Sequence, residues 1–373
     1  MSMLLSNNGF TPRNYPRQIL KINNIKTYLG LTAQEDARLN YALAKGFTGL
    51  QFYGLYGVLG GGNNPNTGNP YESDLAAFIT KARTAPYNFK TIGAILGSGN
   101  AGFINALAYN SSHPAISRFN DFNKENEFWN GFRVDFTVLN AVVGSTYTIT
   151  LNGTPYTHIG VLGDSTTTIA TALAVLCAAS GLVVSSTGNI VKIKDTSSIY
   201  SSFTYSTTGN IDSEEINETY TDWINSLIWL NANIGTNGTI SAYVANSSNN
   251  WGVTEAEQMC AVLDYYEGTN YTTTPNALQN SYRNNQLVNI AQGAANIGKV
   301  QKHYPIFSAE SLTNPTPCGE ATFMGTYLQT NGIVTANTTW KAQYDADPIP
   351  NKSNLSWSGY SYFSYNCLSL YVP

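Results

Sequence analysis

Hydrophobic and polar positions along this chain follow two periods, one typical of strands and one typical of amphipathic helices. Apolar, β-branched runs end at Gly, Asn or Pro, and stretches with apolar residues three or four positions apart follow them. Thr32 is the expected N-cap of the first helix, and Glu35 would complete a capping box. In the first third, the pattern predicts strands over 19–31, 47–58, 90–98 and within 115–129, and helices over 32–46, 71–85 and 101–111.

The alternation stops near residue 132 and resumes near residue 211. The resumed pattern predicts helices over 213–235, 254–266, 275–298 and 320–332, and strands over 239–247, 265–271, 303–311 and within 357–372. Together the two parts predict eight strands that alternate with helices. Without residues 132–210, the chain has about the length of a (β/α)8 barrel, which is typically about 250 residues.

The segment 132–210 has a different pattern, rich in Thr, Ser and Val. Two alternating runs flank Asn152-Gly153, a strong hairpin signal, and a second hairpin surrounds Gly188-Asn189. A capped helix over 164–180 lies between them. We therefore predict a ββαββ domain inserted after the fourth strand.

The predicted fold is an α/β (β/α)8 barrel formed by 1–131 and 211–373, with 132–210 as a separate inserted domain. A doubly wound parallel sheet is the alternative for the same alternation. The strand count and the chain length favour the barrel.

Charge is scarce in this chain. Charged residues make up 11% of the 373 residues, against about 25% in ordinary soluble proteins. Asn, Ser, Thr, Gly and 25 Tyr supply the polarity instead. A surface solvated by amides and hydroxyls repels neighbouring copies only weakly. This composition favours a homo-oligomer or another subunit of a large assembly.

Composition also argues against several kinds of partner. Only 19 Lys and Arg are present, without a basic stripe, so nucleic acid is not the expected partner. Neither the four cysteines nor the three histidines show metal-ligand spacing, so we expect no metal and no cofactor. The loop over 57–70 is glycine-rich, but it contains neither GxxxxGK[ST] nor GxGxxG, the two glycine-rich motifs that bind phosphate.

The N-terminal residues form no signal-peptide core, and no stretch approaches the roughly 20 apolar residues of a membrane span. We expect a protein made in the cytoplasm and found in a virion or another particle released by cell lysis.

The stretch "FNDFNKENEFWNGF" gathers three carboxylates among aromatic residues. Its Asn126-Glu127 pair falls at the expected end of strand four, and Glu310 falls at the expected end of strand seven. In these positions the sequence resembles the clan A retaining glycoside hydrolases. The resemblance implies that Glu127 is the acid/base and Glu310 the nucleophile, with Asn126 contacting the sugar.

The same resemblance implies an aromatic platform at Trp357. The substrate-contacting tyrosine of the family corresponds to Tyr265 or to Tyr266, or has no counterpart here. The arginine expected near strand two has no counterpart. In a non-catalytic barrel, Glu127 and Glu310 would be ordinary acids at strand ends.

Asp121 and Glu125 are alternative members of a carboxylate pair with Glu127, as acidic clusters are in other barrel glycosidases. The strand-four motif of the family-18 chitinases, DxxDxDxE, is absent from "FNDFNKENE". We therefore set that family aside.

The inserted segment resembles a small module that recurs in bacteriophage tail and appendage proteins. The shared features are the "STYTITLNGTPYTHI" hairpin, the helix start at Gly163-Asp164 and the Val-rich second hairpin. The resemblance implies a structural component of a phage-like virion or contractile tail that acts through protein–protein contacts. A retaining glycoside hydrolase or a glycan-binding barrel is the alternative function.

Overall fold

The computed structural model describes residues 17–55, 58, 62–96, 118–126, 132–195, 197, 202–215, 220–234, 238–244, 251–270, 282–308 and 325–372. Their contacts define two compact units. One unit, the barrel, comprises the described residues up to Glu125 and from Leu227 onward. The other unit, the insert, runs from Asn126 to Ser226.

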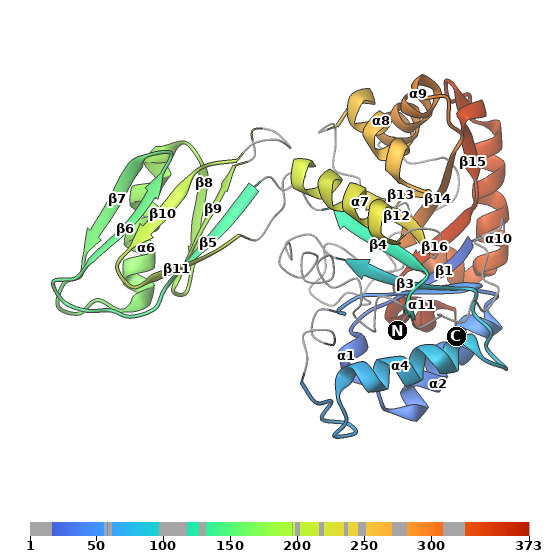
Figure 1. The fold of residues 1–373 in the computed structure, drawn as a ribbon, viewed down its shortest axis with the longest axis horizontal. Helices are drawn as coiled ribbons and strands as arrows, with labels where there is room; N and C mark the ends of the chain where they lie inside the picture. The colour runs from blue at the N-terminus through green and yellow to red at the C-terminus, as the bar shows by residue number, and fades with distance from the viewer. Residues whose placement is uncertain are drawn as a thin grey trace, which may run out of the picture. The chain divides into compact units, whose positions relative to one another are not determined.

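Eight parallel strands of the described chain close into a barrel (Figure 1). Their order is β13-β12-β4-β3-β2-β1-β16-β14, and pairing of β13 with β14 closes the ring. A doubly wound sheet would leave two open edges, so the predicted (β/α)8 barrel is confirmed. The strands are β1 (Arg17–Ile22), β2 (Gly49–Phe52), β3 (Thr91–Leu96), β4 (Asp121–Asn126), β12 (Thr239–Val244), β13 (Tyr265–Thr269), β14 (Gln301–Ser308) and β16 (Gly359–Phe363).

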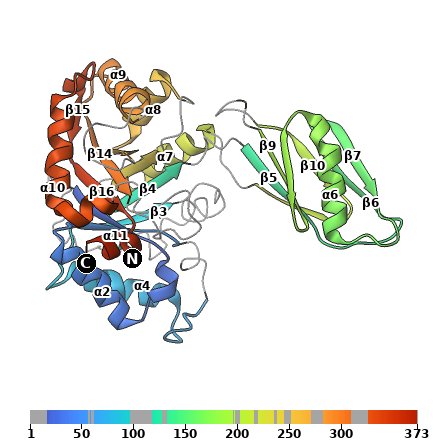
Figure 2. The ribbon, with the colours of Figure 1, turned by 180° about the vertical axis from the view of Figure 1, so that it is seen from behind.

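Helices surround these strands (Figure 2). The strand faces that point outward bury apolar residues against them; Phe52 of β2, for example, meets Phe78 at a ring-centroid distance of 5.5 Å. The helices are α1 (Ile25–Tyr28), α2 (Thr32–Ala44), α4 (Tyr71–Arg83), α7 (Tyr220–Ile234), α8 (Val253–Val262), the π-helix η5 (Tyr282–Leu287), α9 (Val288–Asn296), α10 (Gly325–Ala346), η6 (Lys352–Asn354) and α11 (Tyr365–Tyr371).

The pattern predicted most of these elements, but it was wrong at several boundaries. The strand expected over 19–31 ends at Ile22, and α1 follows it. Thr32 is the first residue of α2 rather than its N-cap, and the Glu35 carboxylate accepts a hydrogen bond from the Gly30 backbone at 2.8 Å. The capping box is therefore absent from this helix start.

The aromatic C-terminal stretch also differs from the single strand predicted within 357–372. It contains β15 (Leu355–Trp357), β16 and then α11. The first half of β14 pairs with β15 through Gln301–His303, whereas its second half pairs with β16 through Ile306–Ser308. Strand β14 therefore has a different neighbour at each of its ends.

Gly359 makes the step from β15 to β16 possible. Its φ is 139°, and a Cβ at this position would collide with the backbone carbonyl of Arg17. The adjacent Ser358 joins two strands, because its N–H donates to the His303 carbonyl at 2.8 Å and its carbonyl accepts from the Arg17 N–H at 2.6 Å. A glycine is required here by the close approach of β1.

The insert contains both predicted hairpins and the predicted helix, together with three further strands. A four-stranded antiparallel sheet has the order β11-β5-β9-β8, and a three-stranded sheet has the order β10-β6-β7. The strands are β5 (Phe132–Val138), β6 (Thr146–Leu151), β7 (Thr154–Ile159), β8 (Val183–Thr187), β9 (Ile190–Asp195), β10 (Tyr205–Thr208) and β11 (Ile211–Glu215), with helix α6 (Thr166–Cys177) and a 3₁₀ turn η3 (Ala178–Ser180).

Strand β11 explains why the helix predicted over 213–235 begins later, at Tyr220. All five residues of β11 pair with β5, between Val134 and Val138, so this segment is a strand and not the start of the helix. Alternation in β5 itself buries Val134 and Phe136 and leaves the residues between them half exposed. These side chains join Leu173 of α6 in an apolar core that belongs to the insert alone.

Candidate functional site

The barrel interior is filled by charged and amide side chains. The Lys21 ammonium donates to Gln51 Oε1 at 2.7 Å and to Glu267 Oε2 at 2.8 Å. The Arg17 guanidinium lies 2.7 Å from the Asp121 carboxylate. Gln51 joins the two ion pairs, because its Nε2 donates to Asp121 at 2.8 Å and to Glu267 at 2.9 Å. All five side chains are buried.

Neighbouring groups complete this network. The Tyr304 hydroxyl donates to Glu267, and the Thr239 hydroxyl donates to Asp121 at 2.7 Å. Gly93 leaves the room for these contacts, since a Cβ there would press against Gln51 and Asp121. The bonded side chains come from six different strands, so the network links strands around the barrel.

The network keeps the Glu267 carboxylate ionised. Burial by itself would raise the pKa of Glu267, but the charge and hydrogen bond of Lys21 outweigh it and hold that pKa below its usual value. Burial by itself would lower the pKa of Arg17, but its neighbours, with the Asp121 charge first among them, raise that pKa above its usual value. Buried charges are tolerated when they are paired and hydrogen-bonded in this way. The interior pairs therefore have a structural role.

Asp121 is consequently not available as a partner of Glu127. Its carboxylate has no access to solvent and is committed to Arg17, Gln51 and Thr239. A general acid must exchange a proton with a bound substrate, which this position does not allow. Asp121 and Glu125 were the two alternative carboxylate partners of Glu127, and Glu125 is the one that remains.

Glu125 lies near the end of β4, on the same face of the strand as Asp121 and Asn123. These alternate positions point inward: Asn123 donates to Ser241 Oγ of β12 at 3.0 Å inside the barrel. Glu125 is half-buried, unlike the two residues before it. Barrel enzymes carry their chemistry at this C-terminal end of the strands.

The two carboxylates predicted as catalytic, Glu127 and Glu310, lie outside the described residues. Asn126 is the last residue of β4, as the sequence predicted for the end of strand four. The catalytic roles of Glu127 and Glu310 therefore stay a prediction.

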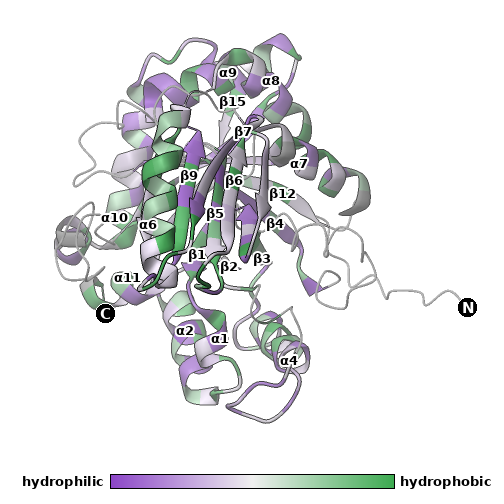
Figure 3. Cartoon of the chain, turned by 90° about the vertical axis from the view of Figure 1, so that its left-hand side faces the viewer, coloured by the Kyte–Doolittle hydropathy of each residue, from purple (hydrophilic) through white to green (hydrophobic). Residues whose placement is uncertain are grey.

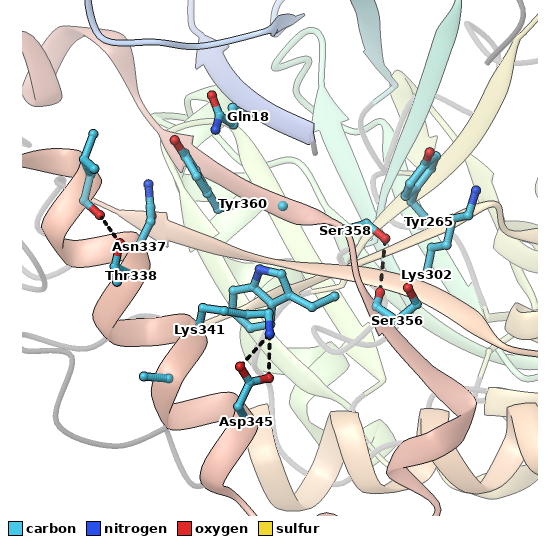
Figure 4. Close-up of a pocket in the computed structure, with 14 residues that line it drawn as sticks. Gln18, Tyr265, Lys302, Asn337, Thr338, Lys341, Asp345, Ser356, Ser358 and Tyr360 are labelled. Atoms are coloured by element: carbon cyan, nitrogen blue, oxygen red, sulfur yellow. Dashed lines mark hydrogen bonds and ion pairs between the residues drawn. The ribbon is translucent and has the colours of Figure 1, made fainter. Parts of the chain in front are cut away.

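Tyr265 and Trp357 are brought together by the structure, but at the other end of the barrel. Both line a pocket of about 870 Å³ beside helix α10 (Figure 4). Tyr265 is the first residue of β13, and Trp357 precedes β16, so the pocket opens where the strands begin. The pocket is lined by Gln18, Tyr265, Lys302, Val334, Asn337, Thr338, Lys341, Ala342, Asp345, Ser356, Trp357, Ser358, Gly359 and Tyr360.

This placement separates the predicted substrate-binding residues into two groups. Asn126 lies at the C-terminal end of the strands, whereas Tyr265 and Trp357 lie at the N-terminal end. The split arises because β15 adds a short strand before β16, which places Trp357 at the start of the last barrel strand. Tyr265 and Trp357 therefore lie at the opposite end of the strands from Asn126.

The sequence analysis did not predict the interior network, although the sequence contains a signal for it. Lys21 interrupts the apolar run "ILKI" and Glu267 interrupts "YYEGT", in a chain that otherwise contains few charges. A charge within a buried strand must have a partner on another strand. That rule would have singled out these two residues as a pair.

Among the described residues, no three His, Cys, Asp or Glu side chains are grouped so that they could hold a metal ion. Of the helices in the described part of the chain, none is long and apolar enough to cross a membrane.

No protein-family model matches the chain, and no curated protein matches its sequence significantly. Solved barrels are similar in fold at low identity. A family-18 chitinase from Pseudoalteromonas aurantia is 9% identical, with 94% of this chain and 96% of that chain covered and a TM-score of 0.41. A Rhizomucor miehei chitinase is 10% identical, with 95% and 98% covered and a TM-score of 0.38.

A third similar structure, a 2,3-dimethylmalate lyase, is 10% identical over 96% of this chain and 79% of that chain, with a TM-score of 0.35.

Proposed function

We propose that this protein is a structural subunit of a larger assembly and that its insert contacts a second copy of the chain. A cluster of exposed apolar side chains on the insert, here called the apolar tip, carries the proposal. Leu162 is 91% exposed and Val143 is 63% exposed. The apolar tip consists of Leu139, Val142, Val143, Ile159, Val161 and Leu162.

The apolar tip is built from two segments held side by side. The Gly144 N–H donates to the Gly160 carbonyl at 2.7 Å, and the Gly160 N–H donates to the Ser145 carbonyl at 2.9 Å. The Tyr147 hydroxyl fixes the first segment by accepting from the Val142 N–H at 2.8 Å and donating to the Asn140 carbonyl at 2.9 Å. A surface held in this way loses little conformational entropy when it is covered.

A second copy is the partner that these features favour. The stretches 139–147 and 157–163 contain no Lys, Arg, Asp or Glu. The adjacent Asp164 carboxylate is already bound to the Val161 N–H at 2.9 Å and to His158 at 2.9 Å, so contact between two identical tips would bury no unpartnered carboxylate. Low charge over the whole chain also weakens repulsion between copies. Apolar patches on otherwise polar surfaces are typical of protein–protein contacts. The resemblance of this segment to phage tail and appendage modules supports the same role, in a virion or tail.

Sedimentation of the whole protein across a concentration series tests the proposal. We expect concentration-dependent association, weakened by Leu162→Ser together with Val143→Ser. Loss of apolar burial of roughly 1.5–3 kcal/mol per side chain should raise the dissociation constant at least tenfold. Leu43→Ser is the matched control, because Leu43 is an exposed apolar residue of α2, 42% exposed, outside the insert. A wild-type chain that stays monomeric at about 1 mM would contradict the proposal.

A glycan-cleaving barrel is a second candidate function. The observation that favours it is the half-buried Glu125 at the C-terminal end of β4, next to the predicted Asn126 and Glu127. Separate Glu125→Gln, Glu127→Gln and Glu310→Gln variants would be assayed for hydrolysis of neutral polysaccharides, with Glu214→Gln on the exposed face of β11 as control. A hydrolysis rate at least a hundredfold lower in the first three variants, with the control unchanged, would support this function. A wild-type protein without hydrolysis would contradict it.

A further inference from the structure

We infer that the pocket between α10 and the beginning of the barrel strands binds a neutral oligosaccharide. The inference is independent of the proposed assembly role and of catalysis at the other end of the barrel. Its volume of about 870 Å³ falls within the range of small-molecule sites, roughly 300–1,000 Å³.

The pocket exists because β14 changes neighbour along its length. At its beginning, β14 pairs with β15, so β16 approaches it only from Ile306 onward. The space beside the first half of β14 is bordered by α10 and by Ser358 and Gly359, where the chain passes from β15 to β16. Figure 4 shows Asn337, Thr338 and Lys341 on α10, across from Tyr265 and Lys302 on the strands. The site is therefore built on regular elements that fix its side chains.

Trp357 supplies an aromatic face at this site. Its side chain is half-buried, and its ring packs against Tyr344 at a centroid distance of 4.9 Å and against His303 at 5.6 Å. Both supporting rings hold the indole in place. A fixed, partly exposed indole offers a flat apolar surface, which suits the C–H face of a sugar ring.

The remaining lining is mostly uncharged and polar. Gln18 and Asn337 offer amides, and Thr338, Ser356 and Ser358 offer hydroxyls. Amides and hydroxyls both donate and accept, so they match the hydroxyl groups of a saccharide. The Thr338 and Ser358 hydroxyls already donate to backbone carbonyls of the protein, and Asn337 Oδ1 accepts from the Tyr362 hydroxyl. The hydroxyl oxygens keep acceptor capacity for the hydroxyl donors of a saccharide.

The charges at the pocket argue against a phosphate or nucleotide ligand. The Lys341 ammonium lies 2.5 Å and 2.6 Å from the two oxygens of Asp345, which neutralises it. The Lys302 ammonium lies 5.4 Å from the Tyr265 ring centroid. The buried His303 beneath Trp357 is neutral, because burial and then the charges of Lys341 and Lys352 lower its pKa to about 3. Anion sites instead present several uncompensated donors.

Titration of the whole protein with defined tetrasaccharides tests the inference. The probes are maltotetraose, cellotetraose, chitotetraose and the anionic tetragalacturonate, with inorganic phosphate as a further probe. We expect one or more neutral probes to bind with a dissociation constant below about 10 mM and to change tryptophan fluorescence. Absence of binding by every neutral probe, or tighter binding of tetragalacturonate or phosphate, would overturn the inference.

Variants locate the binding in this pocket. Trp357→Ala should weaken binding at least tenfold, and Asn337→Ala should weaken it severalfold. Trp357→Phe retains an aromatic ring and should lose less than Trp357→Ala, which distinguishes lost contact from misfolding. Thr335→Ala, on an exposed position of α10 outside the pocket, should bind normally. Unchanged affinity in Trp357→Ala would refute the site, and reduced affinity in Glu125→Gln would move the binding to the opposite end of the barrel.

Discussion

The barrel and the insert bury opposite kinds of side chain at their centres. Inside the barrel, Lys21 and Arg17 are paired with Glu267 and Asp121 through Gln51. The buried core of the insert consists of apolar side chains such as Leu173. The difference teaches that burial alone does not dictate apolar residues. A closed ring of strands supplies partners for a buried charge from several directions, whereas two small sheets and a helix are held together by hydrophobic contact.

The largest expected effect comes from removing one interior carboxylate. Glu267→Gln leaves the buried Lys21 ammonium without its counter-charge, so we expect the barrel to lose about 3–5 kcal/mol in denaturant-induced unfolding. The double variant Lys21→Met with Glu267→Leu should lose clearly less, because no isolated charge remains. If the single variant loses under about 1 kcal/mol, the pairing does not stabilise the barrel in the way we describe.

The corresponding change in the insert is Leu173→Ala. This residue is completely buried in the apolar core, so the expected loss is about 2–5 kcal/mol from reduced burial and the cavity left behind. Hydrogen exchange should show the loss in the insert amides, with barrel amides such as those of β13 unaffected. Equal loss of protection in both units would show that they unfold as one, and that the comparison between two separate cores fails.

Acid should lower the stability of the barrel through groups that are buried in it. His303 has a pKa of about 3 in the folded barrel, against 6.5 as its ordinary value, so the unfolded chain binds a proton that the folded chain does not. Stability from this group is fully present above pH 6.5 and falls as the pH drops toward 3, at up to about 1.4 kcal/mol per pH unit.

Glu267 acts in the same direction at lower pH. Its pKa is lowered in the folded state, so its contribution is present above its ordinary value of 4.5 and is lost as the pH falls through its folded pKa. Unfolding free energies of wild type and His303→Asn between pH 3 and pH 7 measure the first slope. In His303→Asn, the fall in unfolding free energy between pH 6.5 and pH 4.5 should be absent. A pH profile identical to that of wild type would contradict the assignment of this slope to His303.

The smallest expected effect concerns an ion pair of the insert. Arg133 and Asp135 of β5 are 2.5 Å apart, but their side chains keep 29% and 12% exposure. Solvent screens such a pair, so Asp135→Asn should cost no more than about 1 kcal/mol in thermal or denaturant unfolding of the insert. A cost equal to that of Glu267→Gln would mean that burial does not set the difference between the two regions.

The sequence predicted the barrel because its signals are local. Alternation of strands and helices, the two hairpins around Asn152-Gly153 and Gly188-Asn189, and the helix over 164–180 depend on residues close in the chain, and the structure contains them. The short strand at 265–271 also followed from its local pattern, and it appears as β13. Such features are encoded by periodicity and turn chemistry alone.

Tertiary structure alone decided the contacts between distant residues. The pairing of β11 with β5 shortened a helix that local propensity favoured, and the step from β15 to β16 placed Trp357 at the end of the barrel where the strands begin. Tyr265 and Trp357, named from sequence for a different site, meet there in one pocket. The ion pair between Lys21 and Glu267 joins residues 246 positions apart. No pattern within a strand specifies its partner across a barrel, because the register of the closed sheet brings the two charges together.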